Sequence, residues 1–259
     1  MPSWDADQYL KFGEERTRAC RDLVARVAIA SVKTAIDLGC GPGNSTQIIA
    51  ERWPGAQVIG LDSSADMIGA ARLRNPDGAW LVGDIAAWAR DDGGRFDLVC
   101  SNAALQWVTG HAALYPRLLE RVSHGGAFAA QIPHNFDSPA HRAARELAGS
   151  RAWRAELGDH RSPEYEVHDG AFYYDALAPL AARLDIWETT YFQIFPGPSG
   201  IVEWYRGTAL RPYLDALDND ALRERFCADY LAAIRPSYPQ RADGRVAFPF
   251  RRLFVIAYC

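Results

Sequence analysis

The feature that most constrains the fold is an alternation of two kinds of segment over about 100 residues that end at Pro133. Short apolar runs are typical of buried strands, and apolar residues three or four apart are typical of helices. Strands are expected at 33–39, 56–62, 79–84, 95–102 and 125–133, and helices at 5–27, 44–53, 63–73, 85–90 and 113–122. This alternation predicts an α/β fold with a parallel sheet and helices on both faces.

Turn residues support several of these boundaries. The helix at 44–53 opens with Asn-Ser-Thr, which suits N-capping, and Ser63 or Ser64 is the expected N-cap of the next helix. The pair Gly125–Gly126 is expected to form a turn that opens the fifth strand.

Beyond Pro133 the alternation stops. A further helix is expected at 173–184, a long strand at 185–195 and a last strand at 251–259. Two irregular stretches follow: residues at about 136–170 are polar, partly helical and rich in Arg, His and Glu, and those at about 196–249 are mostly helical and rich in Trp, Tyr and Arg. They are expected to be insertions, so residues 1–259 are predicted to form a single domain.

Composition narrows the class of protein. The net charge of −4 argues against a surface for nucleic acid, and no apolar run is long enough to span a membrane. The five cysteines show no CxxC pair, which fits neither a disulfide scaffold nor a zinc site. No signal peptide is visible, so a cytoplasmic protein is expected, a monomer or weak homo-oligomer.

A glycine-rich loop follows the first expected strand, in the sequence AIDLGCGPGNST. Glycines 39, 41 and 43 have GxGxG spacing, and Asn44 replaces the third glycine of the dinucleotide fingerprint GxGxxG. Gly39 and Gly41 are expected to leave room for a ligand beside the backbone. Asp37, just before them, disfavours a phosphate and suits a cationic ligand. A tight turn without a ligand is the alternative.

Two acids end the next two strands. Asp62 is placed to accept hydrogen bonds from the two hydroxyls of a ribose, and Asp84 to accept from an adenine amine. The alternatives are an acid at a helix N-terminus for Asp62 and a surface turn for Asp84. Together they indicate one nucleoside, with nothing provided for a pyrophosphate and a second nucleoside.

The motifs IDLGCGPGNST, GLDSS, VGDI and SNAALQW resemble those of class I S-adenosylmethionine-dependent methyltransferases. The resemblance implies a Rossmann-like sheet of seven mostly parallel strands with one reversed edge strand. It implies S-adenosyl-L-methionine as cofactor, S-adenosyl-L-homocysteine as product and no metal. The implied cofactor-binding residues are Arg16, Gly39, Gly41, Asp62, Ser63, Met67, Asp84, Ile85, the main chain at Asn102, and Trp107. Arg16 on a solvated helix face and Trp107 in the core are the alternatives.

The segments DIWETTY and TALRPYL and the closing FP and RLF resemble the branch of that family that methylates trans-aconitate. This implies a small polycarboxylate acceptor. A carboxylate is ionised near neutral pH, so no general base is expected; arginines are expected to hold it, and the insertions to form a helical substrate cap. The candidates for substrate binding are His134, Tyr173, Tyr174, Trp204, Arg211 and Arg252, with Arg206 and Tyr213 as further possibilities.

Three alternatives stay open. A neutral hydroxyl acceptor requires a general base, for which His134 is the candidate. A dinucleotide oxidoreductase is disfavoured by the GxGxG spacing. A cofactor-binding regulator without turnover fits the arginine- and aromatic-rich insertions less well than an enzyme does. For the pair Tyr173–Tyr174 the alternative is core packing at a helix start, and for each single arginine it is a solvated surface position.

Overall fold

The computed structural model describes residues 13–91, 93–158 and 165–259, with side chains from residue 17 onward. It divides the chain into two compact units. The sheet unit comprises residues 13–133, 165–189 and 252–259, and the helical unit comprises 134–158 and 190–251 within the described ranges.

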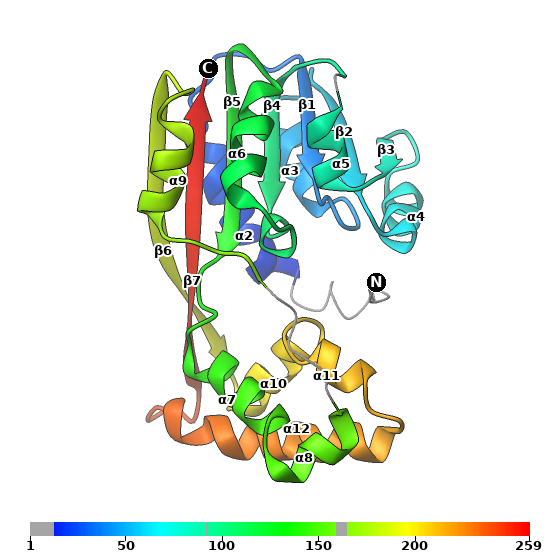
Figure 1. Cartoon of the computed structure of the whole chain (residues 1–259), viewed down its shortest axis with the longest axis vertical. Coiled ribbons are helices and arrows are strands. Elements are labelled where there is room, and N and C mark those ends of the chain that lie inside the picture. Colours follow the sequence, from blue (N-terminus) through cyan, green and yellow to red (C-terminus); the bar gives the residue numbers. More distant parts are fainter. Residues whose placement is uncertain (1–12, 92, 159–164) are drawn as a thin grey trace. The chain divides into compact units, whose positions relative to one another are not determined.

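The sheet has seven strands in the order β3-β2-β1-β4-β5-β7-β6 (Figure 1). Their bounds are β1 Thr34–Leu38, β2 Gln57–Asp62, β3 Ala79–Val82, β4 Phe96–Asn102, β5 Val122–Pro133, β6 Arg183–Phe195 and β7 Val246–Tyr258. Strands β1 to β5 pair in parallel, whereas β7 pairs with β5 antiparallel. The expected reversed strand is therefore present, but it lies one place in from the edge, and β6 is the edge strand.

Helices cover both faces of this sheet. One face packs against α5 Ile85–Arg90, α6 His111–Glu120 and α9 Gly170–Leu177, and its apolar core includes Ile36, Val99, Phe128 and Val255. The other face packs against α2 Gly13–Arg26 and α3 Asn44–Arg52, while α4 Ala65–Arg74 packs against β2 and β3. The fold expected from the alternation is confirmed.

Three local expectations need correction. Ser64 is indeed the N-cap of α4, but the N-cap of α3 is Gly43 in a left-handed conformation, and Ser45 and Thr46 bond elsewhere. Gly125 and Gly126 do not open β5; they lie within it, where the register with β4 shifts. The helix expected at 173–184 begins at Gly170 and ends at Leu177, and β7 begins five residues before 251.

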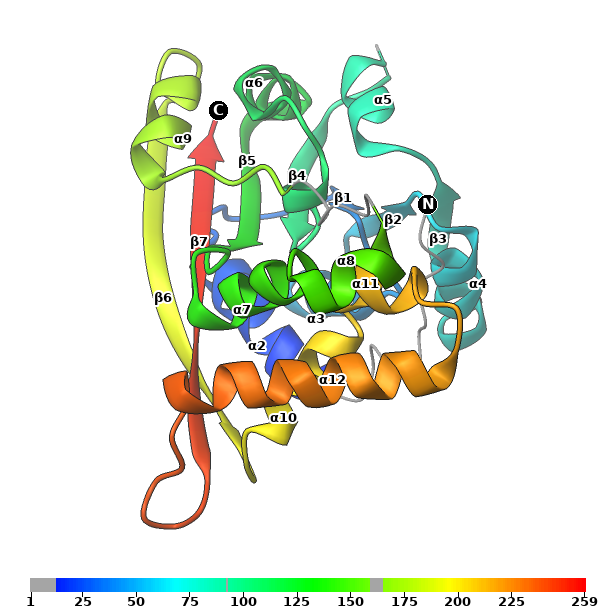
Figure 2. The same ribbon diagram turned by 60° about the horizontal axis from the view of Figure 1, so that its bottom comes forward.

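The helical unit is built from α7 Pro139–Ala148, α8 Arg151–Leu157, α10 Ser199–Arg206, α11 Arg211–Asp215, α12 Asp220–Ile234 and η2 Arg235–Ser237. Helix α12 runs alongside α7 (Figure 2). Their shared core is aromatic and includes Trp153, Tyr205, Phe226 and Phe248. Most of the two expected insertions fall into this unit, but residues 165–170 belong to the sheet unit.

The helix expected from residue 5 is seen from Gly13, and residues 5–12 lie outside the described part. No helix within the described ranges combines the length and apolar character that crossing a membrane requires.

Candidate functional site

The glycine loop joins β1 to α3 at the carboxyl edge of the sheet. Gly39, Gly41 and Gly43 all have positive φ, at 72°, 55° and 90°. A Cβ on Gly39 would lie 2.1 Å from the Cβ of Ala104, and one on Gly43 would lie 2.6 Å from the Trp80 ring. A Cβ on Gly41 would meet nothing within 4 Å. The side of Gly39 that a Cβ would take is therefore filled by Ala104, whereas that side of Gly41 is open; ligand space beside the two backbones stays a prediction.

Asp62 ties this loop to the end of β2. Its Oδ2 accepts a hydrogen bond from the Gly41 amide at 2.9 Å, and its Oδ1 accepts one from the Ser64 amide at 2.9 Å. Each carboxylate oxygen has a second lone pair, so Asp62 retains capacity for two further donors. The carboxylate therefore sits beside the one loop glycine whose missing side chain faces open space.

Asp37 is completely buried beneath the loop. Its Oδ2 accepts hydrogen bonds from the Ser45 and Thr46 hydroxyls at 2.6 and 2.7 Å, while Oδ1 has no partner. Burial raises the pKa of this carboxyl to about 6, against the lowering effect of the two hydroxyl bonds. Asp37 thus joins the end of β1 to the first turn of α3 and leaves one buried acceptor unused.

The other cofactor candidates on this side have distinct environments. Asp84 is exposed and is the N-cap of α5, where its Oδ1 accepts from the Ala87 amide at 2.7 Å. Ile85, the first residue of α5, and Met67 in α4 are buried, whereas Ser63 is exposed. The side chain of Arg16 lies outside the described residues.

The turn after β4 holds an unusual backbone. Ala103 has a φ of +55°, the one positive value at a non-glycine residue in the described ranges. Its amide donates to the Gln131 carbonyl at 2.8 Å, and its carbonyl accepts from Gln106 Nε2 at 2.7 Å. Such backbone strain is concentrated at functional sites. Asn102 precedes this turn, and its Oδ1 is buried without a partner.

The same turn is covered by the segment that follows residue 164. The ring of Trp107 contacts the ring of Tyr165, with centroids 4.8 Å apart, and the Glu166 amide donates to the Gln106 carbonyl at 3.2 Å. Trp107 is half-buried here, which is compatible with both alternatives from the sequence, a cofactor contact and a core position.

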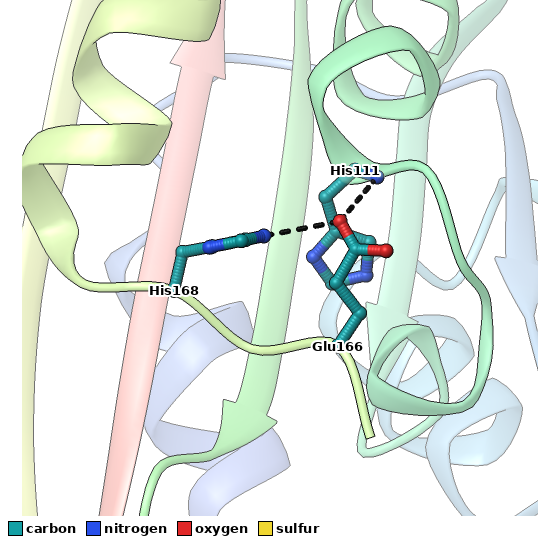
Figure 3. Close-up of side chains that lie close together, drawn as sticks. All are labelled: His111, Glu166 and His168. Atoms are coloured by element: carbon teal, nitrogen blue, oxygen red, sulfur yellow. Dashed lines mark hydrogen bonds and ion pairs between the residues drawn. The ribbon is translucent and has the colours of Figure 1, made fainter. Parts of the chain in front are cut away.

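Glu166 then caps helix α6 (Figure 3). Its carboxylate accepts from the Gly110 amide at 2.6 Å and the His111 amide at 2.8 Å, and it lies 3.0 Å from His168 Nε2. Burial raises the pKa of Glu166, but these hydrogen bonds outweigh it and the net pKa is lowered. The geometry is that of a carboxylate at the positive end of a helix.

Side-chain nitrogen and oxygen atoms of His111, Glu166 and His168 lie within 4.8 Å of one another, which is close enough for metal ligands. Both ring nitrogens of His111 are engaged, however. Nε2 lies 3.0 Å from the Leu105 carbonyl, which only accepts, so Nε2 donates and Nδ1 accepts from the Tyr173 hydroxyl at 2.8 Å. The cluster is therefore a hydrogen-bonded helix cap.

The substrate candidates divide between the two units. In the sheet unit, Tyr173 is fully buried against His111, which places it in the core and not on a pocket wall, while Tyr174 is 54% exposed. Arg252 is buried, and its Nη1 donates to Gln131 Oε1 at 3.3 Å.

In the helical unit, Trp204 and Tyr213 are buried in the aromatic core, and a role for Trp204 in a pocket wall stays a prediction. Arg211 forms an ion pair with Asp215 at 3.3 Å, and Arg206 pairs with Glu203 and Glu224. The His134 amide donates to the Arg251 carbonyl at 2.9 Å, and the His134 carbonyl accepts from Arg251 Nε at 2.6 Å.

Four residues that matter here were missed by sequence reasoning. They are Ala104, which fills the space beside Gly39, Gln106 and Gln131, which hold the Ala103 turn, and Glu166, which caps α6. Glu166 carried no signal as a helix cap because the Gly110 and His111 amides that it accepts from lie more than 50 residues away. Gln131 carried a weak one, as a polar residue near the end of an apolar strand.

Known proteins resemble this chain over its whole length. A family model described as a methyltransferase domain matches residues 35–126. The chain is 49% identical over 257 residues to a trans-aconitate 2-methyltransferase of Azoarcus sp., covering 99% of each chain. It is 44% identical to a trans-aconitate 2-methyltransferase of Paracidovorax citrulli, covering 99% of this chain and 98% of the relative.

Solved structures share the fold at low identity. Phosphoethanolamine N-methyltransferase 2 of Haemonchus contortus, solved with S-adenosyl-L-methionine, has a TM-score of 0.59 at 13% identity. The match covers 98% of this chain and 56% of that chain.

Proposed function

Since the chain belongs to the trans-aconitate 2-methyltransferase family of class I S-adenosylmethionine-dependent methyltransferases, we propose that it forms a monomethyl ester on one carboxylate of trans-aconitate or a related small polycarboxylate. The observation that carries this proposal is the 49% identity over 99% of the chain. Such a match extends through the helical unit as well as the sheet unit, and so beyond the segment that the general methyltransferase model covers.

The carboxyl edge of the sheet fits a cationic nucleoside cofactor. Open space lies beside Gly41, the Asp62 carboxylate adjoins it with acceptor capacity to spare, and Asp37 and Asn102 each keep a buried oxygen without a partner. In this proposal Asp62 holds the ribose, Asp84 and Ile85 adjoin the adenine, and the main chain at Asn102 receives the amino group. Gly39, Ser63, Met67, Trp107 and Arg16 complete the proposed cofactor set.

Bound in this way, the cofactor supplies a methyl group on a positively charged sulfur. The acceptor carboxylate, with an ordinary pKa of about 4, is already ionised at neutral pH, so the chain need not remove a proton. Its task is to hold the reacting oxygen in line with the methyl carbon and to exclude water. Positioning of this kind contributes roughly 7–11 kcal/mol to lowering a barrier.

The acceptor is expected to be held by arginine side chains, which match carboxylates with paired N–H donors. Arg252 and Arg211 are the proposed residues, with His134 and Tyr174 as further contacts. Tyr173 and Trp204 act through packing in this proposal, because both are buried in the cores of their units. We place the enzyme in the cytoplasm as a monomer or weak homo-oligomer, without a nucleic-acid partner.

Isotope-labelled S-adenosylmethionine, incubated with the protein and a panel of di- and tricarboxylates, tests this function. A base-labile methyl ester on trans-aconitate is expected, and no ester from any member of the panel would overturn the proposal. A pH–rate profile with a limb near pH 6–7 and product on phenols or hydroxy acids would favour a neutral hydroxyl acceptor instead. Titration with S-adenosylhomocysteine against NADH tests the cofactor separately.

A further inference from the structure

One face of the sheet gathers polar side chains at its carboxyl edge. Asn102 on β4 and Gln131 on β5 are register partners in parallel strands, so their side chains leave the same face. Gln131 is opposite Phe254 on β7, and Arg252 lies two residues from Phe254, which places Arg252 on that face too. All of these residues belong to the sheet unit.

The Gln131 amide is buried and only half satisfied. Gln131 is only 1% exposed. Its Oε1 accepts a hydrogen bond from Arg252 Nη1 at 3.3 Å, whereas its Nε2 has no partner. A guanidinium can only donate, so the amide oxygen must face Arg252 and the NH2 group must face away from it. Arg252 therefore sets the orientation in which Gln131 presents its donors.

A buried N–H without a partner is destabilising, and native proteins retain few of them. Here the unused donor lies at the end of the strand where ligands of open α/β sheets bind. A donor next to a buried guanidinium selects an anionic oxygen. The neighbouring Asn102 instead leaves an acceptor unused, which suits an N–H group and disfavours a carboxylate.

We propose that Gln131 is a specificity-determining residue whose Nε2 donates to a carboxylate of the acceptor, beside the positive charge of Arg252. This inference rests on the proposed function, since it names the residues that recognise the polycarboxylate. Phe254, the register partner of Gln131, stacks on Trp187 with ring centroids 4.6 Å apart, so apolar rings flank this site. A hydrogen bond to a charged group is stronger in apolar surroundings.

The test compares Gln131→Met, which keeps the volume and removes the donor, with Gln131→Glu, which keeps the shape and puts a negative charge there. For trans-aconitate, the KM is expected to rise about tenfold or more in Gln131→Met and further in Gln131→Glu. The Kd for S-adenosylhomocysteine should stay within about threefold of the wild-type value, which also reports that each variant is folded. The matched control is Gln193→Met, a buried glutamine on β6 in the helical unit, with KM unchanged.

A second readout is acceptor selectivity. Wild-type enzyme is expected to prefer a tricarboxylate to an analogue that lacks one carboxylate, and Gln131→Met to lose most of that preference. The inference is overturned if the wild type esterifies trans-aconitate while Gln131→Met keeps its KM and its selectivity. It is also overturned if both variants raise the Kd for S-adenosylhomocysteine by as large a factor as the KM for the acceptor. Absence of product with wild-type enzyme would instead overturn the proposed function itself.

Discussion

The two units of the chain treat their buried polar groups differently. At the carboxyl edge of the sheet unit, unpartnered buried atoms come from β1, β4, β5 and the turn after β4, namely Asp37 Oδ1, Asn102 Oδ1, Gln131 Nε2 and Gln106 Oε1. The helical unit buries mainly aromatic rings, and its arginines 206 and 211 are ion-paired with acids of the same unit. Among its described residues it also keeps two buried oxygens without a partner, Asn135 Oδ1 and Ser150 Oγ, but neither residue lies in a strand of the sheet. The difference teaches that polar groups left without a partner gather at the sheet edge, where we propose the ligand binds, whereas the core of the helical unit is mainly aromatic packing.

The largest effect is expected at Gly39. An alanine there would combine a φ of +72° with a Cβ 2.1 Å from Ala104, so Gly39→Ala should lower the free energy of unfolding by more than about 3 kcal/mol and abolish cofactor binding. Thermal melts and S-adenosylhomocysteine titration measure both. Gly69→Ala, with nothing within 4 Å of its added Cβ, is the control. Retained binding in Gly39→Ala would contradict the tight packing of this loop.

The pH dependence of stability should have opposite signs in the two units. Asp37 has a folded-state pKa of about 6 against an ordinary 3.8. Its contribution to the free energy of unfolding is therefore complete below about pH 4 and is lost as the pH rises through 6. Burial lowers the pKa of His141 in the helical unit to about 4 from 6.5, with a further lowering by Arg145, so its contribution is lost as pH falls from about 6.5 to 4.

Relative to Asp37→Asn, the wild type should therefore lose about 3 kcal/mol of unfolding free energy between pH 4 and 7. Relative to His141→Gln, it should gain a similar amount over the same range. Denaturant unfolding at several pH values measures both differences. Two differences of the same sign would break the contrast.

Asp62→Asn is the next test of the sheet edge. The variant removes the negative charge beside Gly41 and half of the acceptor capacity, so the Kd for S-adenosylhomocysteine should rise about tenfold or more, with little change in the acceptor KM. Asp66→Asn, an exposed acid in the first turn of α4, is the control and should bind normally. Equal binding by the two variants would show that Asp62 serves only the turn.

Arg211→Ala asks whether the helical unit also recognises the acceptor. An arginine that binds a carboxylate should raise the acceptor KM about tenfold when removed, with the cofactor Kd unchanged. Asp215→Asn removes the partner of Arg211 and keeps the guanidinium. If both variants have the same kinetic defect, Arg211 acts only through its ion pair, and acceptor recognition by this unit would need another residue.

The smallest effect is expected at the cap of α6. Glu166→Ala removes the carboxylate that accepts from the Gly110 and His111 amides, and a lost cap of this kind costs about 1 kcal/mol. Because the pKa of Glu166 is lowered on folding from its ordinary 4.5, its contribution to stability should be complete above that pH and should be lost as the pH falls below it. Melting of Glu166→Ala is compared with Glu120→Ala, an exposed acid in the same helix. Equal melting temperatures would contradict the cap.

Local patterns predicted much of the fold, because strands of the parallel sheet are buried on both faces and read as apolar runs. The same patterns could not assign the roles of the glycines. Glycine is needed at positions 39 and 43 because Ala104 and Trp80, tens of residues further along the chain, fill the space that a Cβ would take. Of the three loop glycines, only Gly41 faces open space. Spacing also could not tell that Tyr173 is buried while its neighbour Tyr174 is exposed, because that depends on the position of α9 against the sheet.

Asp62 and Asp84 were singled out from the sequence because acids at strand ends follow a general rule of open α/β sheets, but the N-cap role of Asp84 in α5 was not predicted. Gln131 and Gln106 were not singled out, since a single glutamine has no spacing rule and its importance arises from atoms left unpaired after folding.

The left-handed Ala103 has a consequence for how tightly a ligand binds. Its amide and carbonyl are both fixed by glutamines 131 and 106, so the turn holds its shape before any ligand arrives. The entropy of ordering this segment is lost when the chain folds and not when a ligand binds, which leaves more of the contact energy available as affinity. A rigid turn of this kind also limits departures of the reacting groups from in-line geometry, so preorganisation increases the rate as well as the affinity.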